Sequence, residues 1–310
     1  MQNSILCIGE ILWDRLPEGD FLGGAPFNVA YHLKKFEGEV AFISRIGEDA
    51  LGKLTLERVE ALGLSTAYIQ QDKDLPTGVV DVTFTEGGVP HYTIREPAAW
   101  DAIDLDEQTS RLIRTSQAIV FGTLAQRNSV TAQTISSIHA SSALKVLDLN
   151  LRAPYDQLET VRESLEIADF LKVNDEEFQR LQEWFGLPES MSEAAGLLSE
   201  KFNLNVICVT CGGEGAFLFH DGEWIKSGGV KIRATDTIGA GDAFLAVLLT
   251  GFLKQFPMQK LLDRANRFGA YIATQKGGTP TYEIGTLEEI DHLPLPGSGV
   301  SEDIPAEDHQ

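Results

Sequence analysis

Short apolar runs alternate along this chain with longer segments whose apolar residues recur at helical spacing. The runs with strand character cover residues 5–8, 40–44, 118–121, 146–149, 170–173 and 206–210. The segments with helical character cover residues 49–62, 129–142, 175–185 and 193–202. Such alternation predicts an α/β protein with a mostly parallel sheet that helices cover on both faces, and ligands bind such sheets beyond the carboxyl ends of the strands.

The overall charge excludes two classes of partner. The chain has 310 residues, 43% of them hydrophobic, and a formal net charge of −21. Nucleic acid and anionic membranes would be repelled by that charge, so an anionic ligand must be held by local features. The three cysteines suggest no disulfide framework, and the sequence shows neither a leader pattern nor a long apolar run. We therefore expect a cytoplasmic protein.

A glycine turn precedes a strongly apolar helical run near the end of the chain. Residues 236–242 read DTIGAGD, with Gly239, Ala240, Gly241 and Asp242 directly before the run 243–249. The glycines allow a tight turn, and the helix start directs N–H groups and its positive dipole end into that turn, where phosphate oxygens would fit. Asp242 would then be placed to accept a proton from an attacking hydroxyl. The alternative is a plain glycine loop in which Asp242 is an ordinary N-terminal helix carboxylate.

A second glycine pair begins another helix near the N-terminus, in the segment GGAPFNVA at residues 23–30. Together, and in this order, the two elements make the chain resemble the ribokinase-like, PfkB-type carbohydrate kinases. The resemblance implies a three-layer α/β/α sugar kinase domain over residues 1–293, with a small β lid formed by about residues 10–22 and 77–97. Residues 294–310 are rich in proline, glycine and acidic side chains, so we expect an acidic tail without fixed structure.

The lid prediction depends on a break in the α/β alternation. Between Thr77 and Arg95, two strand-like runs flank the glycine turn Glu86-Gly87-Gly88, which is a hairpin pattern. A lid would exclude water that competes with the sugar hydroxyl. Because exposed strand edges pair readily, the lid also suggests a homodimer. A plain surface hairpin remains the alternative.

Two residues near the N-terminus are candidates for gripping the sugar. Asp14 follows an apolar strand, and its carboxylate could accept hydrogen bonds from two adjacent hydroxyls. Asn28 can both donate and accept, while Gly23 and Gly24 would let the backbone come close. The resemblance implies sugar binding for Asp14 and Asn28, and for Asp242 as the base. A satisfied polar residue inside a helix is the alternative for Asn28.

The segment Asp148-Leu149-Asn150-Leu151-Arg152 places further polar side chains at a strand end. It resembles the D-x-N-x-R of fructokinase and ketodeoxygluconate kinase relatives. Asn150 and Arg152 are candidates for the sugar site, since a planar guanidinium suits phosphate or sugar oxygens. A salt bridge is an equal alternative for Arg152, and Arg95 is a weaker candidate of the same kind.

Magnesium and nucleotide roles are implied by an N-x-x-E element and by a second glycine loop. Mg²⁺ prefers oxygen ligands and keeps several waters, so Asn174 and Glu177 would act through its hydration shell. The resemblance implies that the nucleotide contacts Thr210, Gly212, Gly215, Gly241, Asn174 and Asn266. For Asn266, an exposed asparagine on a helix is the alternative.

A monovalent cation is a softer expectation. Asp236, Ile238 and Gly277 correspond to the loops that hold such an ion in many members of the resembled family. A site of this kind is built largely from carbonyl oxygens, which any sequence supplies, so the residues leave potassium open.

These observations favour an ATP-dependent kinase that transfers the γ-phosphoryl group to a sugar hydroxyl. The form GGAPFNVA is closer to the fructokinase motif than to the ribokinase motif, so fructose is the preferred acceptor. Ketodeoxygluconate, ribose or a nucleoside are alternatives, because a few lid side chains decide the fit. A sugar or nucleotide sensor without turnover is the non-enzyme alternative, although both the base and the glycine turn are intact.

Overall fold

The protein divides into two compact units, which we describe separately. The computed structural model describes residues 4–17, 19–36, 38–84, 90–283, 285–291 and 299–300. The first unit comprises Met1–Leu144 together with Gly277–Thr279, and the second comprises Lys145–Lys276 and Pro280–Gln310. Of the residues predicted to bind the sugar, Asp14, Gly23, Gly24 and Asn28 belong to the first unit, and Asn150, Arg152 and Asp242 belong to the second.

The first unit contains a parallel sheet with strand order β8-β1-β4-β5. Its strands are β1 (Ser4–Ile8), β4 (Glu39–Gly47), β5 (Ile69–Asp72) and β8 (Ala118–Phe121). All four residues of β8 are buried, and β1 is buried after its first residue. Burial on both faces explains why these strands read as continuous apolar runs.

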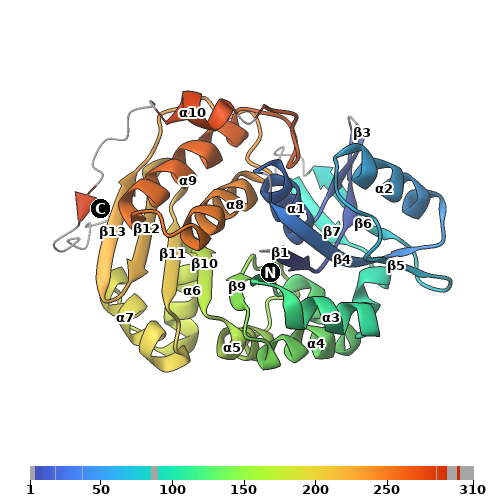
Figure 1. The fold of residues 1–310 in the computed structure, drawn as a ribbon, viewed down its shortest axis with the longest axis horizontal. Helices are drawn as coiled ribbons and strands as arrows, with labels where there is room; N and C mark the ends of the chain where they lie inside the picture. Colours follow the sequence, from blue (N-terminus) through green and yellow to red (C-terminus); the bar gives the residue numbers. More distant parts are fainter. Residues whose placement is uncertain are drawn as a thin grey trace. The chain divides into compact units, whose positions relative to one another are not determined.

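Helices cover both faces of this sheet (Figure 1). On one face lie α1 (Ala25–Lys35) and α2 (Ala50–Ala61), and on the other lie α3 (Glu107–Thr115) and α4 (Ser129–Ser136). Asp49, Asp106 and Asn128 cap the last three, since each side chain accepts a hydrogen bond from a backbone N–H in the first turn. Short 3₁₀ helices complete the unit: η1 (Ala99–Ala102), η2 (Leu124–Arg127) and η3 (Ser137–Ala140).

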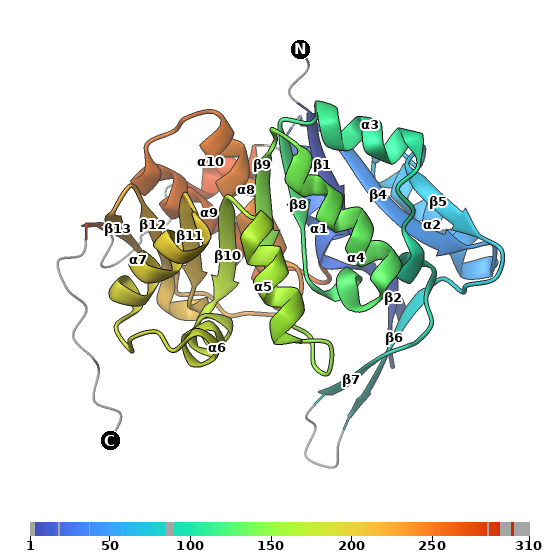
Figure 2. The ribbon, with the colours of Figure 1, turned by 90° about the horizontal axis from the view of Figure 1, so that it is seen from below.

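A second, four-stranded sheet of the first unit has the order β3-β2-β6-β7. Its strands are β2 (Leu12–Leu16), β3 (Gly19–Gly23), β6 (Gly78–Phe84) and β7 (Pro90–Ile94). The predicted hairpin is therefore present as the antiparallel pair β6–β7, which projects from the unit in Figure 2. Its turn, residues 85–89, lies outside the described residues. Both predicted lid segments thus join one sheet, and the lid role itself stays a prediction.

The second unit has a sheet of six strands in the order β14-β13-β12-β11-β10-β9. Strands β9 to β11 are parallel and the remaining pairs are antiparallel. The strands are β9 (Leu144–Asp148), β10 (Phe170–Asn174), β11 (Val206–Thr210), β12 (Gly215–His220), β13 (Glu223–Gly228) and β14 (Gly299–Val300). Strand β14 is the only described part of the predicted tail 294–310, whose other residues lie outside the described chain.

Helices again lie on both faces of this sheet (Figure 2). One face carries α5 (Leu158–Ile167), α6 (Asp175–Phe185) and α7 (Met191–Phe202); the other carries α8 (Ala240–Leu253), α9 (Met258–Ala273) and α10 (Thr286–Ile290). Every residue of α8 from Asp242 to Leu249 is buried, which explains the uninterrupted apolar run after the glycine turn. A 3₁₀ turn, η4 (Gly212–Glu214), joins β11 to β12.

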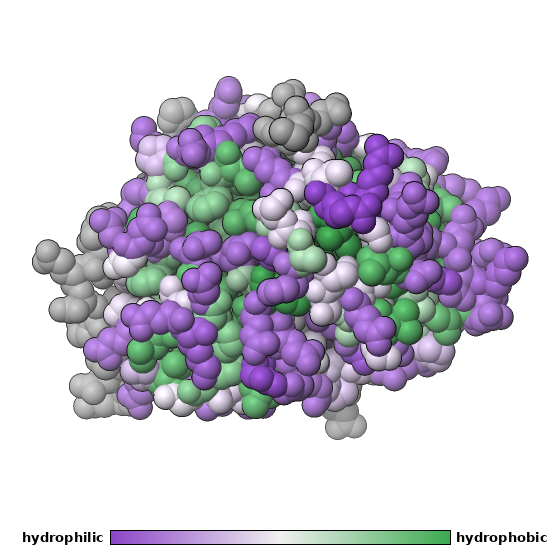
Figure 3. Space-filling model, turned by 60° about the horizontal axis from the view of Figure 1, so that its bottom comes forward, coloured by the Kyte–Doolittle hydropathy of each residue, from purple (hydrophilic) through white to green (hydrophobic). Residues whose placement is uncertain are grey.

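The surface shown in Figure 3 is largely hydrophilic. Hydrophilic residues surround smaller groups of hydrophobic ones on the face shown in Figure 3. Among the described residues, no helix is both long enough and apolar enough to cross a membrane. The three cysteines are free thiols, as the sequence predicts.

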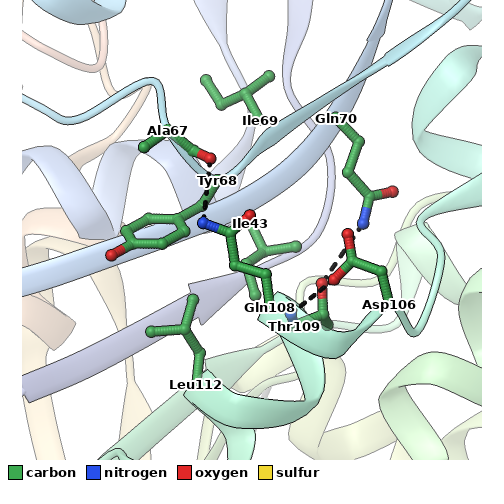
Figure 4. Close-up of a pocket in the computed structure, with 9 residues that line it drawn as sticks. All are labelled: Ile43, Ala67, Tyr68, Ile69, Gln70, Asp106, Gln108, Thr109 and Leu112. Atoms are coloured by element: carbon green, nitrogen blue, oxygen red, sulfur yellow. Dashed lines mark hydrogen bonds between the residues drawn. The ribbon is translucent and has the colours of Figure 1, made fainter.

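A small cavity of about 150 Å³ lies between strand β5 and helix α3 of the first unit (Figure 4). Its polar side chains join these two elements: Gln70 donates to the Asp104 carbonyl at 2.9 Å, and Gln108 donates to the Ala67 carbonyl at 3.4 Å. The Asp106 carboxylate, at the cavity edge, caps α3 through the Thr109 N–H. The hydrogen bonds of Gln70 and Gln108 hold β5 and the residues before it against α3 and the residues before it. The polar side chains that line the cavity therefore have a structural role.

Candidate active site

The predicted anion turn begins helix α8 as the sequence suggests. Gly239 is the N-cap residue with φ 76°, a left-handed conformation that favours glycine, and no side chain caps the helix. Asp242 follows in the first turn, and its side chain is buried. An uncapped helix start presents N–H groups to whatever occupies the turn. The turn can therefore hold an anion next to a carboxylate.

A buried ion pair lies beneath this turn. Lys172 on β10 pairs in register with Asp148 on β9, and its Nζ lies 3.0 Å from Asp148 Oδ1 and 3.2 Å from Oδ2. A Cβ atom placed on Gly241 would lie 3.0 Å from the same Nζ. Burial by itself lowers the pKa of Lys172, but the nearby carboxylates of Asp148, Glu177 and Asp242 outweigh it and raise that pKa. Lys172 is therefore a charged group directly against the glycine turn at the start of α8.

The N-x-x-E element forms a capping box at the start of α6. Asn174 Oδ1 accepts from the Glu177 N–H at 2.7 Å, and Glu177 Oε2 accepts from the Asn174 N–H at 2.9 Å. Glu177 Oε1 accepts from the Leu151 N–H at 2.7 Å, so this carboxylate also holds the loop after β9. Burial, with the Asp148 charge in addition, raises the pKa of Glu177. The two predicted metal residues thus lie together, beside Lys172.

These oxygens suit a hydrated ion better than direct coordination. Both carboxylate oxygens of Glu177 already accept backbone N–H groups. Across the described chain, no cluster of three or more histidine, cysteine, aspartate or glutamate side chains could hold a metal directly. Mg²⁺ retains water and takes phosphate oxygens as ligands, so the remaining lone pairs of Asn174 and Glu177 fit contact through that water.

The loop after β9 has one residue in a strained conformation. Asn150 has φ 42°, in the left-handed region that asparagine tolerates better than most residues. Arg152 is exposed, and its Nη1 donates to the Leu151 carbonyl at 2.9 Å. The salt bridge that we considered for Arg152 is not among the ion pairs of the described residues. Arg95 of the first unit is committed elsewhere, because Nη2 donates to Asp81 Oδ1 at 2.8 Å.

The second glycine loop has a packing role that the sequence did not reveal. Gly215 has φ 106°, and a Cβ there would lie 2.0 Å from the Ser227 carbonyl. Thr210 Oγ1 donates to the Val173 carbonyl at 3.3 Å, while Gly212, with φ 49°, has open space around it. Gly212 and Gly213 therefore leave room for close approach by a ligand, whereas Gly215 does not.

Asn266 differs from the exposed helical asparagine that we considered as its alternative. It is buried on α9, where its Nδ2 donates to the Gly228 carbonyl at 2.6 Å and to Ser227 Oγ at 3.4 Å. The exposed alternative is therefore wrong. The contact fixes the end of β13, and the nucleotide role of Asn266 stays a prediction.

The predicted monovalent cation residues divide between the units. Asp236 Oδ1 accepts from the Ile238 N–H at 3.0 Å, so these two share one turn of the second unit. The backbone N–H of Asp236 donates to the Ala273 carbonyl at 3.1 Å. Gly277 belongs to the first unit. The structure therefore brings together two members of this set.

The predicted sugar residues of the first unit lie together around the start of α1. A Cβ on Gly23 would lie 2.7 Å from Asp14 Oδ2, and a Cβ on Gly24 would lie 2.4 Å from the Glu10 carbonyl oxygen. Glu10 Oε1 also accepts from the Ala25 N–H at 3.3 Å. Only glycine fits where these backbones meet, and the Asp14 carboxylate lies directly against the glycine pair.

Asn28, in the first turns of α1, contacts a turn from the far end of the sequence. It is 4% exposed, and a Cβ on Gly278 would lie 2.7 Å from its Nδ2. One helical turn later, His32 Nε2 lies 3.0 Å from the Gly278 carbonyl oxygen. Burial, opposed in part by this hydrogen bond, lowers the pKa of His32 to about 4, so the ring is neutral and donates from Nε2. The Asn28 side chain therefore packs against Gly278 on the buried face of α1.

Sequence reasoning assigned no role to Lys172, Glu10 or His32. Lys172 carried a usable signal, because a lysine inside an apolar strand is rarely buried unless it is paired. His32 follows Asn28 by one helical turn, but its partner is a carbonyl oxygen, which leaves no trace in the sequence.

The chain is similar to known carbohydrate kinases. Residues 19–284 match the pfkB family of carbohydrate kinases. The fructokinase of Escherichia coli is 28% identical over 89% of this chain and 95% of its own length. An uncharacterised sugar kinase of Pyrococcus horikoshii, known from its crystal structure, superimposes with a TM-score of 0.80 at 25% identity over 92% of this chain and 97% of its own.

A fructokinase from Xylella fastidiosa, solved with bound ATP, shares the fold with a TM-score of 0.80 at 20% identity, over 94% of this chain and 98% of its own. The ribokinase-like, three-layer α/β/α fold class predicted from the sequence is confirmed. The chain therefore belongs to the pfkB family of carbohydrate kinases.

Proposed function

We propose that this sugar kinase uses ATP to phosphorylate a sugar hydroxyl, with fructose as the preferred acceptor. The observation that carries the proposal is the uncapped start of α8, where the left-handed Gly239 turn lies directly before the buried Asp242. The similarity to the Escherichia coli fructokinase supports the choice of fructose. The sugar motif GGAPFNVA supports it independently.

The proposed reaction uses residues of both units. Asp242 accepts the proton of the sugar hydroxyl while the oxygen of that hydroxyl forms a bond to the γ-phosphorus. The bond between the γ-phosphorus and the β–γ bridging oxygen breaks, and ADP is released. The N–H groups at Gly239, Ala240 and Gly241 stabilise charge on the transferring group. Asp14 and Asn28, with Gly23 and Gly24, grip the sugar, and Asn150 and Arg152 assist; this follows from their chemistry.

We further propose a nucleotide side built from Thr210, Gly212 and Asn266, with Gly215 shaping the loop through its close backbone packing and with Mg²⁺ held through water by Asn174 and Glu177. Mg²⁺ would supply charge neutralisation for the phosphates. A potassium ion at the carbonyl oxygens near Asp236, Ile238 and Gly277 is part of the same proposal. Loss of turnover in EDTA, and a comparison of potassium with sodium salts, would test the two ions.

A homodimer through the lid is a separate proposal. Strand β3 is an edge of the four-stranded sheet, and Phe21 on it is 39% exposed. An exposed edge with an apolar side chain favours pairing with a second copy. Sedimentation should show a dimer at micromolar concentration that Phe21→Asp weakens, and a monomer for the unmodified chain would contradict the proposal.

A coupled ADP-release assay across ketoses, aldoses, sugar acids and nucleosides tests the function. We expect fructose to give the highest kcat/KM. Preferred turnover of ketodeoxygluconate, ribose or a nucleoside would keep the kinase and replace the acceptor. Binding of sugar or ATP without ADP release from any acceptor would overturn the enzyme assignment in favour of a sensor.

A further inference from the structure

The charge distribution under the catalytic turn has a feature that the proposed reaction does not use. Lys172 is fully within the protein core, and its ammonium group contacts the Asp148 carboxylate through two distances of 3.0 and 3.2 Å. Burying such a pair is costly, and well-packed apolar residues would often serve stability better. A purely structural role is therefore a weak explanation for a lysine in the middle of the largely apolar strand β10.

The ammonium group also lies against the turn itself. Gly241 has no Cβ, and a Cβ at that position would come within 3.0 Å of Lys172 Nζ. The second glycine of the GAGD element therefore leaves room for a cation as well as allowing the helix to start. Three carboxylates, those of Asp148, Glu177 and Asp242, act on the same ammonium group. Together they would repel a triphosphate if no positive charge lay among them.

We propose that Lys172 is a positioning residue of the phosphoryl-transfer site, a fixed cation that supports the Gly239–Asp242 turn and offsets the neighbouring carboxylates when phosphate binds. The Asp148 carboxylate holds the ammonium group in place. Because Gly241 has no Cβ, the ammonium group can approach the backbone of the turn. This inference rests on the proposed kinase function of the same turn. It assigns to one lysine a role that the helix N-terminus and Mg²⁺ do not fill.

A set of charge variants separates this role from that of a buried ion pair. Lys172→Gln leaves Asp148 buried without its cation and lowers both stability and turnover. Lys172→Gln combined with Asp148→Asn replaces the pair by two neutral amides that can bond to each other, so most of the stability returns. We expect kcat of this double variant to stay at least about tenfold below that of the unmodified enzyme.

Two controls complete the set. Asp148→Asn alone keeps the cation, so its kcat should exceed that of the double variant. Lys145 Nζ lies 3.2 Å from Asp169 Oδ2 beside the opposite ends of the same two strands, and Lys145→Gln should leave kcat unchanged within about twofold. Urea unfolding reports stability, and kcat with KM for ATP and for the sugar reports the reaction. KM for the sugar should change least.

The outcomes are distinct. Recovery of kcat to within about twofold in the double variant, together with recovered stability, would overturn the proposal and leave Lys172 a structural ion pair. An equal loss of kcat in Asp148→Asn and in the double variant would also overturn it. If the unmodified protein turned over no acceptor, the kinase proposal would fail separately. Calorimetric binding of Mg-ADP would then still test Lys172, with about tenfold weaker binding expected in the double variant and unchanged binding contradicting it.

Discussion

Glycine turns precede both α1 and α8, and the glycines of the two turns are required for different structural reasons. In the first unit, Gly24 lies at φ 118° where a Cβ would come within 2.4 Å of the Glu10 carbonyl oxygen. In the second unit, the nearest group to a Cβ on Gly241 is the Lys172 ammonium, at 3.0 Å. The first turn is closed by rigid backbone, and the second borders the charged end of a side chain.

The comparison shows that a glycine pattern does not by itself identify an anion site. Neither N-cap residue caps its helix with a side chain, but at the start of α1 the Ala25 N–H already donates to Glu10 Oε1 and Pro26 has no N–H. Around the α1 turn lie the carboxyl groups of Glu10 and Asp14, which suit hydroxyl groups and disfavour phosphate. Around the α8 turn the carboxylates of Asp148, Glu177 and Asp242 are accompanied by the Lys172 ammonium group. The cation at the second turn therefore distinguishes the proposed triphosphate site from the proposed sugar site.

The largest expected effect belongs to the base. Asp242→Asn should lower kcat by roughly 10²–10⁴-fold, because the amide cannot accept the hydroxyl proton, while ATP binding changes little. Asp14→Asn, the matched change in the other turn, should mainly raise KM for the sugar. Steady-state kinetics with calorimetric ATP binding would measure both. Turnover within about threefold of the unmodified enzyme in Asp242→Asn would remove this residue from the mechanism.

Alanine substitution at one glycine of each turn tests the comparison directly. Gly24→Ala should lower the free energy of unfolding by about 2–4 kcal/mol, because positive φ and a backbone clash add together. Gly241→Ala meets only the end of a flexible side chain, so we expect a cost of about 1 kcal/mol or less in stability and a larger loss in kcat. Urea unfolding and kinetics report the two quantities. Equal destabilisation by both variants would contradict the distinction drawn here.

Local sequence patterns predicted much of the fold and of this site. Continuous apolar runs located β1, β4, β8, β9, β10 and β11, since strands buried on both faces need such runs. The antiparallel strands β12 and β13 escaped prediction, because the alternation of strands and helices carries no information about an added edge. The GAGD element placed Asp242 correctly at a helix start, because the chemistry of that turn is local in sequence.

The unpredicted parts of the site depend on contacts between distant segments. Lys172 meets Asp148 only because β9 and β10 pair in register, and Gly241 approaches them from another helix. Gly278 meets Asn28 and His32 although the chain between them is most of the protein. Hydrogen bonds to backbone carbonyls and contacts between distant segments cannot be read from a single sequence. Side-chain positions were thus predictable where the motif is contiguous.

The Gly278 contact extends the comparison to the sugar side. A Cβ at Gly278 would lie 2.7 to 3.0 Å from the amide atoms of Asn28, so Gly278→Ala should displace that side chain. We expect KM for the sugar to rise about tenfold with ATP binding unchanged, because the affected residue contacts only the sugar in our proposal. Gly277→Ala is a poor control because Gly277 has φ 72°; Gly285→Ala, at a position with open space, is the matched one. An unchanged KM for the sugar would contradict a role of Asn28 in sugar binding.

The smallest effect concerns pH. In the folded protein burial lowers the pKa of His32 from 6.5 to about 4, so between these values the unfolded chain binds a proton that the folded chain does not. Stability is therefore fully present above about pH 6.5 and falls as pH drops, by up to about 1.4 kcal/mol per pH unit. His32→Gln can still donate to the Gly278 carbonyl but does not titrate, so its unfolding free energy should fall less over this window. Urea unfolding at pH 7 and pH 5 measures the difference, and parallel losses in the two proteins would show that His32 is not neutral in the folded state.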